Sequence, residues 1–123
     1  MLSMLDAAML MSLDEVCTNV LILAEGLEKD EFLSSRLTRA EVKHQILTMT
    51  GLAKNISPSI CNMMPELDWA GFEVLTVQIG QGGSAENEAL WFAITSLIPA
   101  TLMWLRVYKK DNPTLFSFQP KAL

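Results

Sequence analysis

The sequence predicts an all-α protein, an antiparallel bundle of four to five helices, on three observations. Leu, Met and Ala dominate a chain of 123 residues, of which 50% are hydrophobic but only 7% aromatic, and unbranched side chains favour helix over sheet. Apolar residues recur at gaps of three and four, and cap and stop residues separate segments of helical length. A chain of this length holds one domain, so we assign residues 1–110 to the bundle and 111–123 to a C-terminal tail.

The first predicted helix spans residues 2–27 and is apolar on more than one face. One stripe consists of Leu2, Leu5, Met9, Leu13, Val16, Val20, Leu23 and Leu27. A second flank consists of Leu10, Met11, Leu21 and Ile22. A helix with two apolar flanks usually has two neighbours, and we expect one of them to be another subunit. Gly26 and the charged run at 28–31 predict a solvated loop after this helix.

The second helix is expected to begin at Thr38, because Thr38 and Glu41 have the spacing of a capping box. It continues to Ile56, where Ser57 and Pro58 stop it. Pro58 suits the first position of a short further turn of helix.

The third and fourth helices are predicted from their caps. Asp68 is the expected N-cap of a helix over residues 69–79. Ser84 is the expected N-cap of a longer helix that runs to about residue 110 and bends at Pro99. The tail after it contains Phe116 and Phe118, which we expect to pack on the bundle.

The stretch TVQIGQGGS at 76–84 contains three glycines within four residues. It lacks the spacing of a dinucleotide-binding fingerprint and the lysine of a P-loop, so it does not predict a phosphate site. The glycines indicate a helix end followed by a turn.

Charge and cysteine content narrow the function class. The net charge is −5, and an acidic chain without clustered Lys and Arg is a poor partner for nucleic acid. Cys17 and Cys61, both in apolar surroundings, are predicted to be buried free thiols. The acidic amino end does not resemble a signal peptide, so we expect a cytoplasmic protein.

One segment requires a membrane test. Residues 89–105 are uncharged and precede Arg106 and Lys109. The segment is at the short limit for a span, and Pro99 weakens it, so a helix buried in a bundle is the preferred interpretation. A membrane-associated helical protein is the alternative.

His44 is the single histidine, and no second histidine or cysteine lies at metal-ligand spacing from it. We therefore predict no metal site and no cofactor. The Trp91, Phe92 and Trp104 cluster is interpreted as core or subunit interface.

Two stretches resemble the HepT-like branch of the HEPN-domain proteins. They are DEFLSSRLTRAEVKHQI at 30–46 and AKNISPSICNMMPELDW at 53–69, and LSMLDAA near the start is similar to the family's opening. The matching residues of the second stretch are Ala53, Lys54, Ser57, Pro58, Pro65, Glu66 and Trp69. The resemblance covers about residues 2–108.

This resemblance implies a four- to five-helix HEPN-type bundle that forms a homodimer. Active members are metal-independent ribonucleases that serve as toxins, with a minimal nucleotidyltransferase as antitoxin. Their chemistry rests on an Arg-x(4–6)-His motif with a nearby Tyr, and the two copies face each other in the dimer. The histidine acts as general acid or base, and the arginine stabilises phosphorane charge.

The positions that correspond to Arg, His and Tyr of this motif are Thr76, Gln81 and Gly83. All three catalytic residue types are absent, so the chain departs from the family where its chemistry lies. The leading hypothesis is a catalytically inactive, dimeric binding or assembly module with a nucleotidyltransferase as candidate partner. The alternative is an active ribonuclease toxin that uses His44 with Arg36 or Arg39 and is neutralised by that antitoxin.

Overall fold

The computed structural model describes residues 4–116, and these form helices without any strand. The elements are α1 (Met4–Ala24), α2 (Lys29–Ser34), α3 (Arg36–Asn55), α4 (Pro58–Met63), α5 (Trp69–Gly80), α6 (Gly83–Phe92), the π-helical segment η1 (Ala93–Leu97), α7 (Ile98–Asp111) and the 3₁₀ turn η2 (Pro113–Leu115). The all-α class is therefore confirmed.

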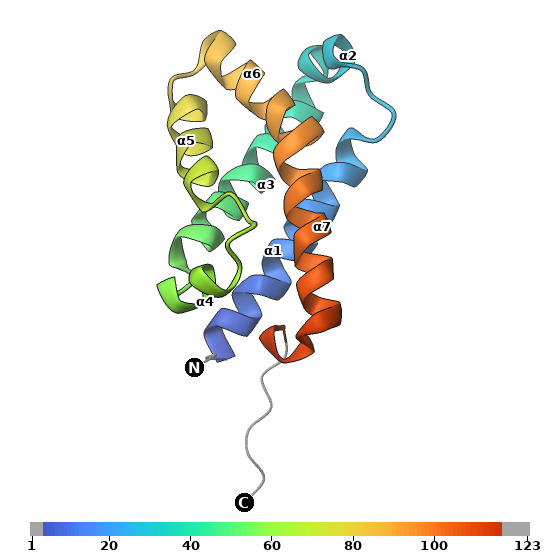
Figure 1. The fold of residues 1–123 in the computed structure, drawn as a ribbon. Coiled ribbons are helices and arrows are strands. Elements are labelled where there is room, and N and C mark those ends of the chain that lie inside the picture. The colour runs from blue at the N-terminus through green and yellow to red at the C-terminus, as the bar shows by residue number, and fades with distance from the viewer. Residues whose placement is uncertain (1–3, 117–123) are drawn as a thin grey trace, which may run out of the picture.

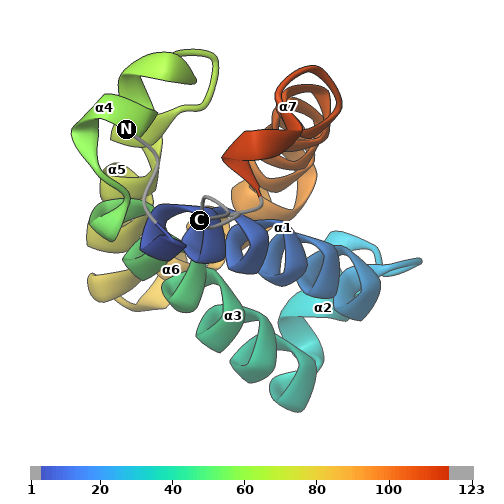
Figure 2. The same cartoon turned by 90° about the horizontal axis from the view of Figure 1, so that it is seen from below.

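The long helices alternate in direction along the chain, so that α1, α3, α5 and the α6–α7 helix form an antiparallel bundle (Figure 1). Helix α1 packs against both α3 and α7, and it lies between them when the bundle is seen from its end (Figure 2). Helix α5 packs against α3 and α6. The short helix α4 and the described end of α7 lie at the same end of the bundle as the start of α1 (Figure 1).

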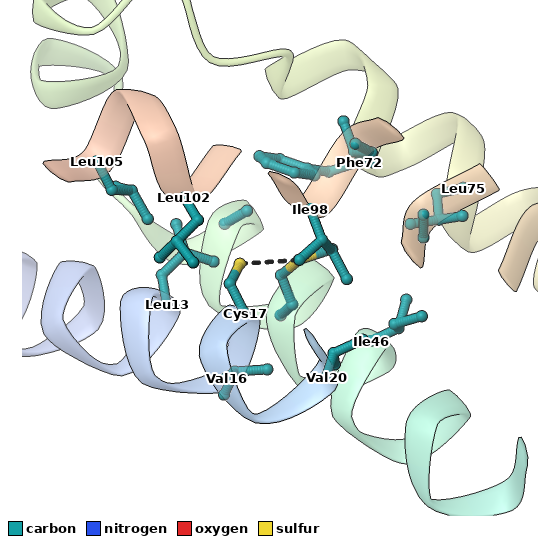
Figure 3. Packing of buried hydrophobic residues seen from close by; sticks show 14 of the residues in the cluster. Leu13, Val16, Cys17, Val20, Ile46, Phe72, Leu75, Ile98, Leu102 and Leu105 are labelled. Carbon is teal, nitrogen blue, oxygen red and sulfur yellow. Dashed lines mark hydrogen bonds between the residues drawn. The ribbon is translucent and has the colours of Figure 1, made fainter. Parts of the chain in front are cut away.

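The core lies where the four long helices meet (Figure 3). Leu13 and Val20 of α1 and Ile46 of α3 are fully buried there. The thiol of Cys17 lies 3.6 Å from the sulfur of Met49, which joins α1 to α3 within the core. The predicted apolar stripe of the first helix is confirmed from Met9 to Val20, whereas Leu5 and Leu23 are exposed and Leu2 lies outside the described residues.

The second apolar flank of α1 divides into two parts. Leu10 is buried and Leu21 is half-buried within the chain, whereas Met11 and Ile22 are exposed. Part of the extra apolar surface is therefore covered by the protein's own helices.

The predicted start of the second long helix is wrong. Helix α3 begins at Arg36 with Ser35 as its N-cap, so Thr38 and Glu41 lie inside it. The capping box is formed by Glu28 and Glu31 instead, in the charged run expected to be a loop, which belongs to α2 and its cap. The reason is Phe32, which is fully buried and anchors this short amphipathic helix.

The cap of the last long helix is also different from the prediction. Gly82 takes the N-cap position and α6 begins at Gly83, so Ser84 lies within the first turn. The Asp68 cap is confirmed, because its carboxylate accepts a hydrogen bond from the Gly71 N–H at 2.9 Å. The short helix that begins at Pro58 is confirmed as α4.

The helix from Gly83 to Asp111 changes direction between α6 and α7 (Figure 1). The π-helical segment Ala93–Leu97 occupies this point and ends two residues before Pro99. Proline lacks an N–H and crowds the preceding turn, and a wider turn relieves this crowding. The bend expected at Pro99 is therefore located just before that residue.

Leu115 and Phe116 follow α7 and are buried in the same core as the bundle. This agrees with the packing expected for Phe116. Phe118 lies outside the described residues.

Candidate binding surface around helix α5

The positions that correspond to the family's catalytic residues lie along α5 and at its end. Thr76 is exposed, and its hydroxyl donates to the Phe72 carbonyl of the preceding turn at 2.9 Å. Gln81 is the exposed C-cap of α5, and Gly83 begins α6. The structure thus places all three on one helix and the turn that follows it.

These side chains limit what the surface can do chemically. A glutamine amide donates and accepts hydrogen bonds but exchanges no proton near neutral pH, and threonine has no charge. General acid–base catalysis needs a group that exchanges a proton near neutral pH, and stabilisation of a phosphorane needs a positively charged group. Residues 74–85 contain no ionisable side chain. This segment can therefore take part in binding, but it lacks the groups for ribonuclease chemistry by an arginine and a histidine.

The glycines have a geometric role, and the helix end and turn predicted from them are confirmed. The N–H groups of Gln81 and Gly82 donate to the carbonyls of Gln78 and Ile79, both at 3.2 Å. Gly82 and Gly83 then have φ angles of +70° and +58°. Two successive left-handed residues need glycine, and they let α6 begin at once on the far side of the turn.

The alternative catalytic set is not brought together. Arg39 donates from Nη1 to the Leu33 carbonyl at 2.6 Å and so closes the corner between α2 and α3. His44 and Arg36 are exposed on α3, and no hydrogen bond or ion pair joins His44 to either arginine within residues 4–116. In the same range, no group of three His, Cys, Asp or Glu residues could hold a metal ion.

The residues that carry the family resemblance make long-range contacts at the other end of the bundle. The Asp6 carboxylate, only 5% exposed, accepts from the Ser57 N–H at 3.0 Å and from the Ser57 hydroxyl at 2.8 Å. A carboxylate from α1 therefore holds Ser57, the residue that precedes α4, across 51 residues of sequence. This role of Asp6 has no local sequence signal.

The loop between α4 and α5 is held by two further residues of the same motif. The Trp69 indole N–H donates to the Met64 carbonyl at 3.0 Å. The Tyr108 hydroxyl of α7 donates to the Glu66 carboxylate. That hydrogen bond, and next the slight burial of the phenol, raise the pKa of Tyr108 to about 12.

Two cavities flank α5. One, of about 530 Å³, lies between α3, α4 and α5, and Thr76 and Val77 line it. The other, of about 670 Å³, lies between α5 and α6 and is lined by residues that include Val74, Gln81 and Phe92. Thr76 and Gln81 therefore open on different sides of the helix.

The outer strip of α5 between these cavities is exposed and uncharged. Val74 is 55% and Val77 62% exposed, and Ala70 and Gln81 continue the strip at helical spacing. Phe92 of α6, 53% exposed, adjoins Val74 in the lining of the second cavity. We call Ala70, Val74, Val77, Gln81 and Phe92 the α5 face. Exposed apolar patches without charge are typical of interaction surfaces.

The two thiols are free, as predicted, but only one is fully buried. Burial raises the pKa of Cys17 to about 12. Cys61 is half-buried beside the first cavity, and its burial, followed by the charge of Asp6, raises the pKa of its thiol. Both shifts disfavour the reactive thiolate at neutral pH.

Two helices, Met4–Ala24 and Gly83–Asp111, are long and apolar enough to cross a membrane. In each, 44% of the most apolar window is buried inside the bundle. The core helices of soluble proteins have the same properties, so this is weak support for a membrane location.

The comparisons with known proteins add no relative. The chain matches no protein-family model, no curated protein and no solved structure.

Proposed function

We propose that this protein is a catalytically inactive HepT-like HEPN-domain protein that acts in the cytoplasm as a homodimeric binding and assembly module. The observation that supports it is the exposed, uncharged α5 face at the positions where the family has Arg, His and Tyr. The surface retains the location of the old site but offers apolar and amide groups in place of reactive ones.

Charge favours a second copy as the occupant of this face. The chain has a net charge of −5, so most approaches of two copies are opposed by like-charge repulsion. Residues 74–85 contribute no charge, so a contact centred on them leaves the bordering carboxylates of Glu73 and Glu88 at its rim. The amides of Gln78 and Gln81 donate as well as accept, so they can pair with their own copies across a twofold axis.

The dimer is tested by the substitution Val74→Glu, with Val107→Glu on α7 as the matched control, since both valines are exposed. We expect the wild type and the control to be dimers in analytical ultracentrifugation at micromolar concentration. Val74→Glu should be a monomer with an unchanged helical circular dichroism spectrum. A monomeric wild type, or a Val74→Glu variant that still dimerises, contradicts the proposed interface.

The absence of catalysis is tested separately with purified protein and a mixture of single-stranded RNAs. We expect no cleavage by the wild type. The double variant Thr76→Arg, Gln81→His should gain cleavage, because both side chains are exposed and the dimer would place two restored motifs opposite each other. Wild-type cleavage that His44→Ala abolishes supports the active-toxin alternative, with RNA as substrate. A minimal nucleotidyltransferase remains the candidate partner of the dimer.

A further inference from the structure

The cavity between α3, α4 and α5 has an apolar interior. Ala53, Ile56 and Phe72 are buried in its walls. Trp69 stands edge-on to Phe72, with ring centroids 5.7 Å apart and planes at 78°. A volume of about 530 Å³ is within the range of small-molecule sites, which are mostly apolar with a few polar groups at defined places.

The polar groups of the walls are already committed to the protein. The hydroxyl hydrogens of Thr50 and Thr76 are donated to carbonyls one turn earlier, at 3.1 and 2.9 Å. The Trp69 N–H and the Cys61 thiol are donated to backbone carbonyls in the same way. Because no donor is left in these walls, the interior is suited to an apolar group and not to a polar one.

The mouth is different, because three polar side chains from three helices surround it. They are Lys54 of α3, Asn62 of α4 and Glu73 of α5, all exposed. In the described part of the chain none of them makes a side-chain hydrogen bond or ion pair, and Lys54 and Glu73 do not pair with each other. One ammonium from α3 and one carboxylate from α5 therefore belong to the same cavity lining without an ion-pair partner in the described part of the chain.

This arrangement selects a ligand by charge. A simple anion gains from Lys54 but is opposed by Glu73 and by the acidic chain as a whole. A simple cation meets the converse conflict with Lys54. A ligand with a carboxylate and an ammonium side by side can satisfy both groups, while an aromatic or branched side group fills the interior.

We propose that this cavity binds a small zwitterion with a bulky apolar side group, the chemistry of an apolar α-amino acid. Its carboxylate lies toward Lys54 and Asn62, its ammonium toward Glu73, and its side group against Trp69 and Phe72. This inference does not depend on the proposed function.

The test is isothermal titration calorimetry of the purified protein at pH 7 with three probes of the same shape: L-phenylalanine, phenethylamine and 3-phenylpropanoate. We expect phenylalanine to bind, and the amine and the acid, each lacking one charge, to bind at least tenfold more weakly. Equal binding of the three probes, or binding of none, overturns the proposal.

Variants assign the charges. Lys54→Met should weaken the binding of phenylalanine and leave that of phenethylamine unchanged or tighter. Glu73→Gln should also weaken the binding of phenylalanine, but leave that of 3-phenylpropanoate unchanged or tighter. The matched controls Lys110→Met and Glu25→Gln, exposed residues outside the cavity lining, should change nothing. Phenylalanine binding that persists in both cavity variants contradicts the assignment.

The dimer and the cavity are separated by one further measurement. Val74 does not line this cavity, so Val74→Glu should bind phenylalanine as the wild type does even if it is monomeric. Thr76 is exposed and lines the cavity. The longer side chain of Thr76→Met should occupy part of the cavity and abolish phenylalanine binding while the fold stays intact. Undiminished binding by Thr76→Met shows that the ligand lies elsewhere and refutes the site.

Discussion

The two ends of the bundle are held together by different means. At the end that contains α4 (Figure 1), buried Asp6 of α1 bonds Ser57, and Glu66 bonds Tyr108 of α7. At the opposite end, α6 is tied to α2 and α3 by the ion pairs Lys29–Glu88 and Lys43–Glu86, each with at least one exposed partner. Exposed ion pairs contribute little to stability. We refer to the α4 end, where the Asp6 carboxylate is buried, as the firmly held end.

The family resemblance follows the same division. The residues that match the family at 53–69 make the contacts of the firmly held end, whereas the positions of its catalytic motif lie toward the other end and have none of the motif's residues. Under the proposed family membership, the departures from the family pattern therefore lie at the end opposite the Asp6–Ser57 contact.

The largest effect is expected at the firmly held end, from Asp6→Ala. It leaves the half-buried Ser57 N–H and hydroxyl without their buried acceptor, and we expect a loss of about 3 kcal/mol of unfolding free energy. Asp14→Ala on the same helix should cost less than about 0.5 kcal/mol. Urea denaturation followed by circular dichroism measures both, and equal losses would show that the buried cap is unimportant.

A smaller effect is expected at the opposite end, from Gly82→Ala. Alanine must adopt a φ of +70° there, and we expect a loss of about 1 kcal/mol. Gly80→Ala is the control, since Gly80 is helical, with nothing within 4 Å of an added Cβ. That variant should gain about 0.5–1 kcal/mol. Thermal unfolding compares the two, and a stabilised Gly82→Ala would mean that the turn does not need a left-handed residue.

The same contrast explains how far the sequence predicts the structure. The Asp68 cap, the Pro58 turn and the glycine turn depend on neighbouring residues, and each is confirmed. The start of α3 was mispredicted, because Thr38 and Glu41 have the spacing of a capping box but lie inside a helix whose N-cap is Ser35. The same spacing at Glu28–Glu31 forms the actual box, which belongs to α2.

Long-range features have no such local signal. The bond of Asp6 to Ser57 joins residues 51 positions apart. The cavity beside Trp69 is built from three helices, so its polar rim becomes visible only when Lys54, Asn62 and Glu73 are brought together by the fold. The family resemblance singles out Thr76, Gln81 and Gly83 along the sequence, but it does not predict that Thr76 and Gln81 face two separate cavities.

The smallest effect concerns the Glu66–Tyr108 contact at the firmly held end, and it can be measured directly because the chain has 1 tyrosine. The folded pKa of Tyr108 is raised to about 12, above about 10 for an unfolded chain. A raised pKa means that the folded state favours the protonated phenol. The contribution to stability is therefore fully present below about pH 10 and is lost as the pH rises toward 12. Because Tyr108 lies near the surface, solvent screens the contact and the change in stability is small.

Tyrosinate absorbance at 295 nm should titrate near pH 12 in the folded protein. In Glu66→Gln the midpoint should fall toward 10, since the acceptor carboxylate and its charge are gone. Asp68→Asn, which alters a nearby carboxylate that caps α5 instead, should leave the midpoint near 12. A wild-type midpoint of about 10 would place Glu66 among the weak surface contacts, and the firmly held end would then depend on Asp6 and Trp69.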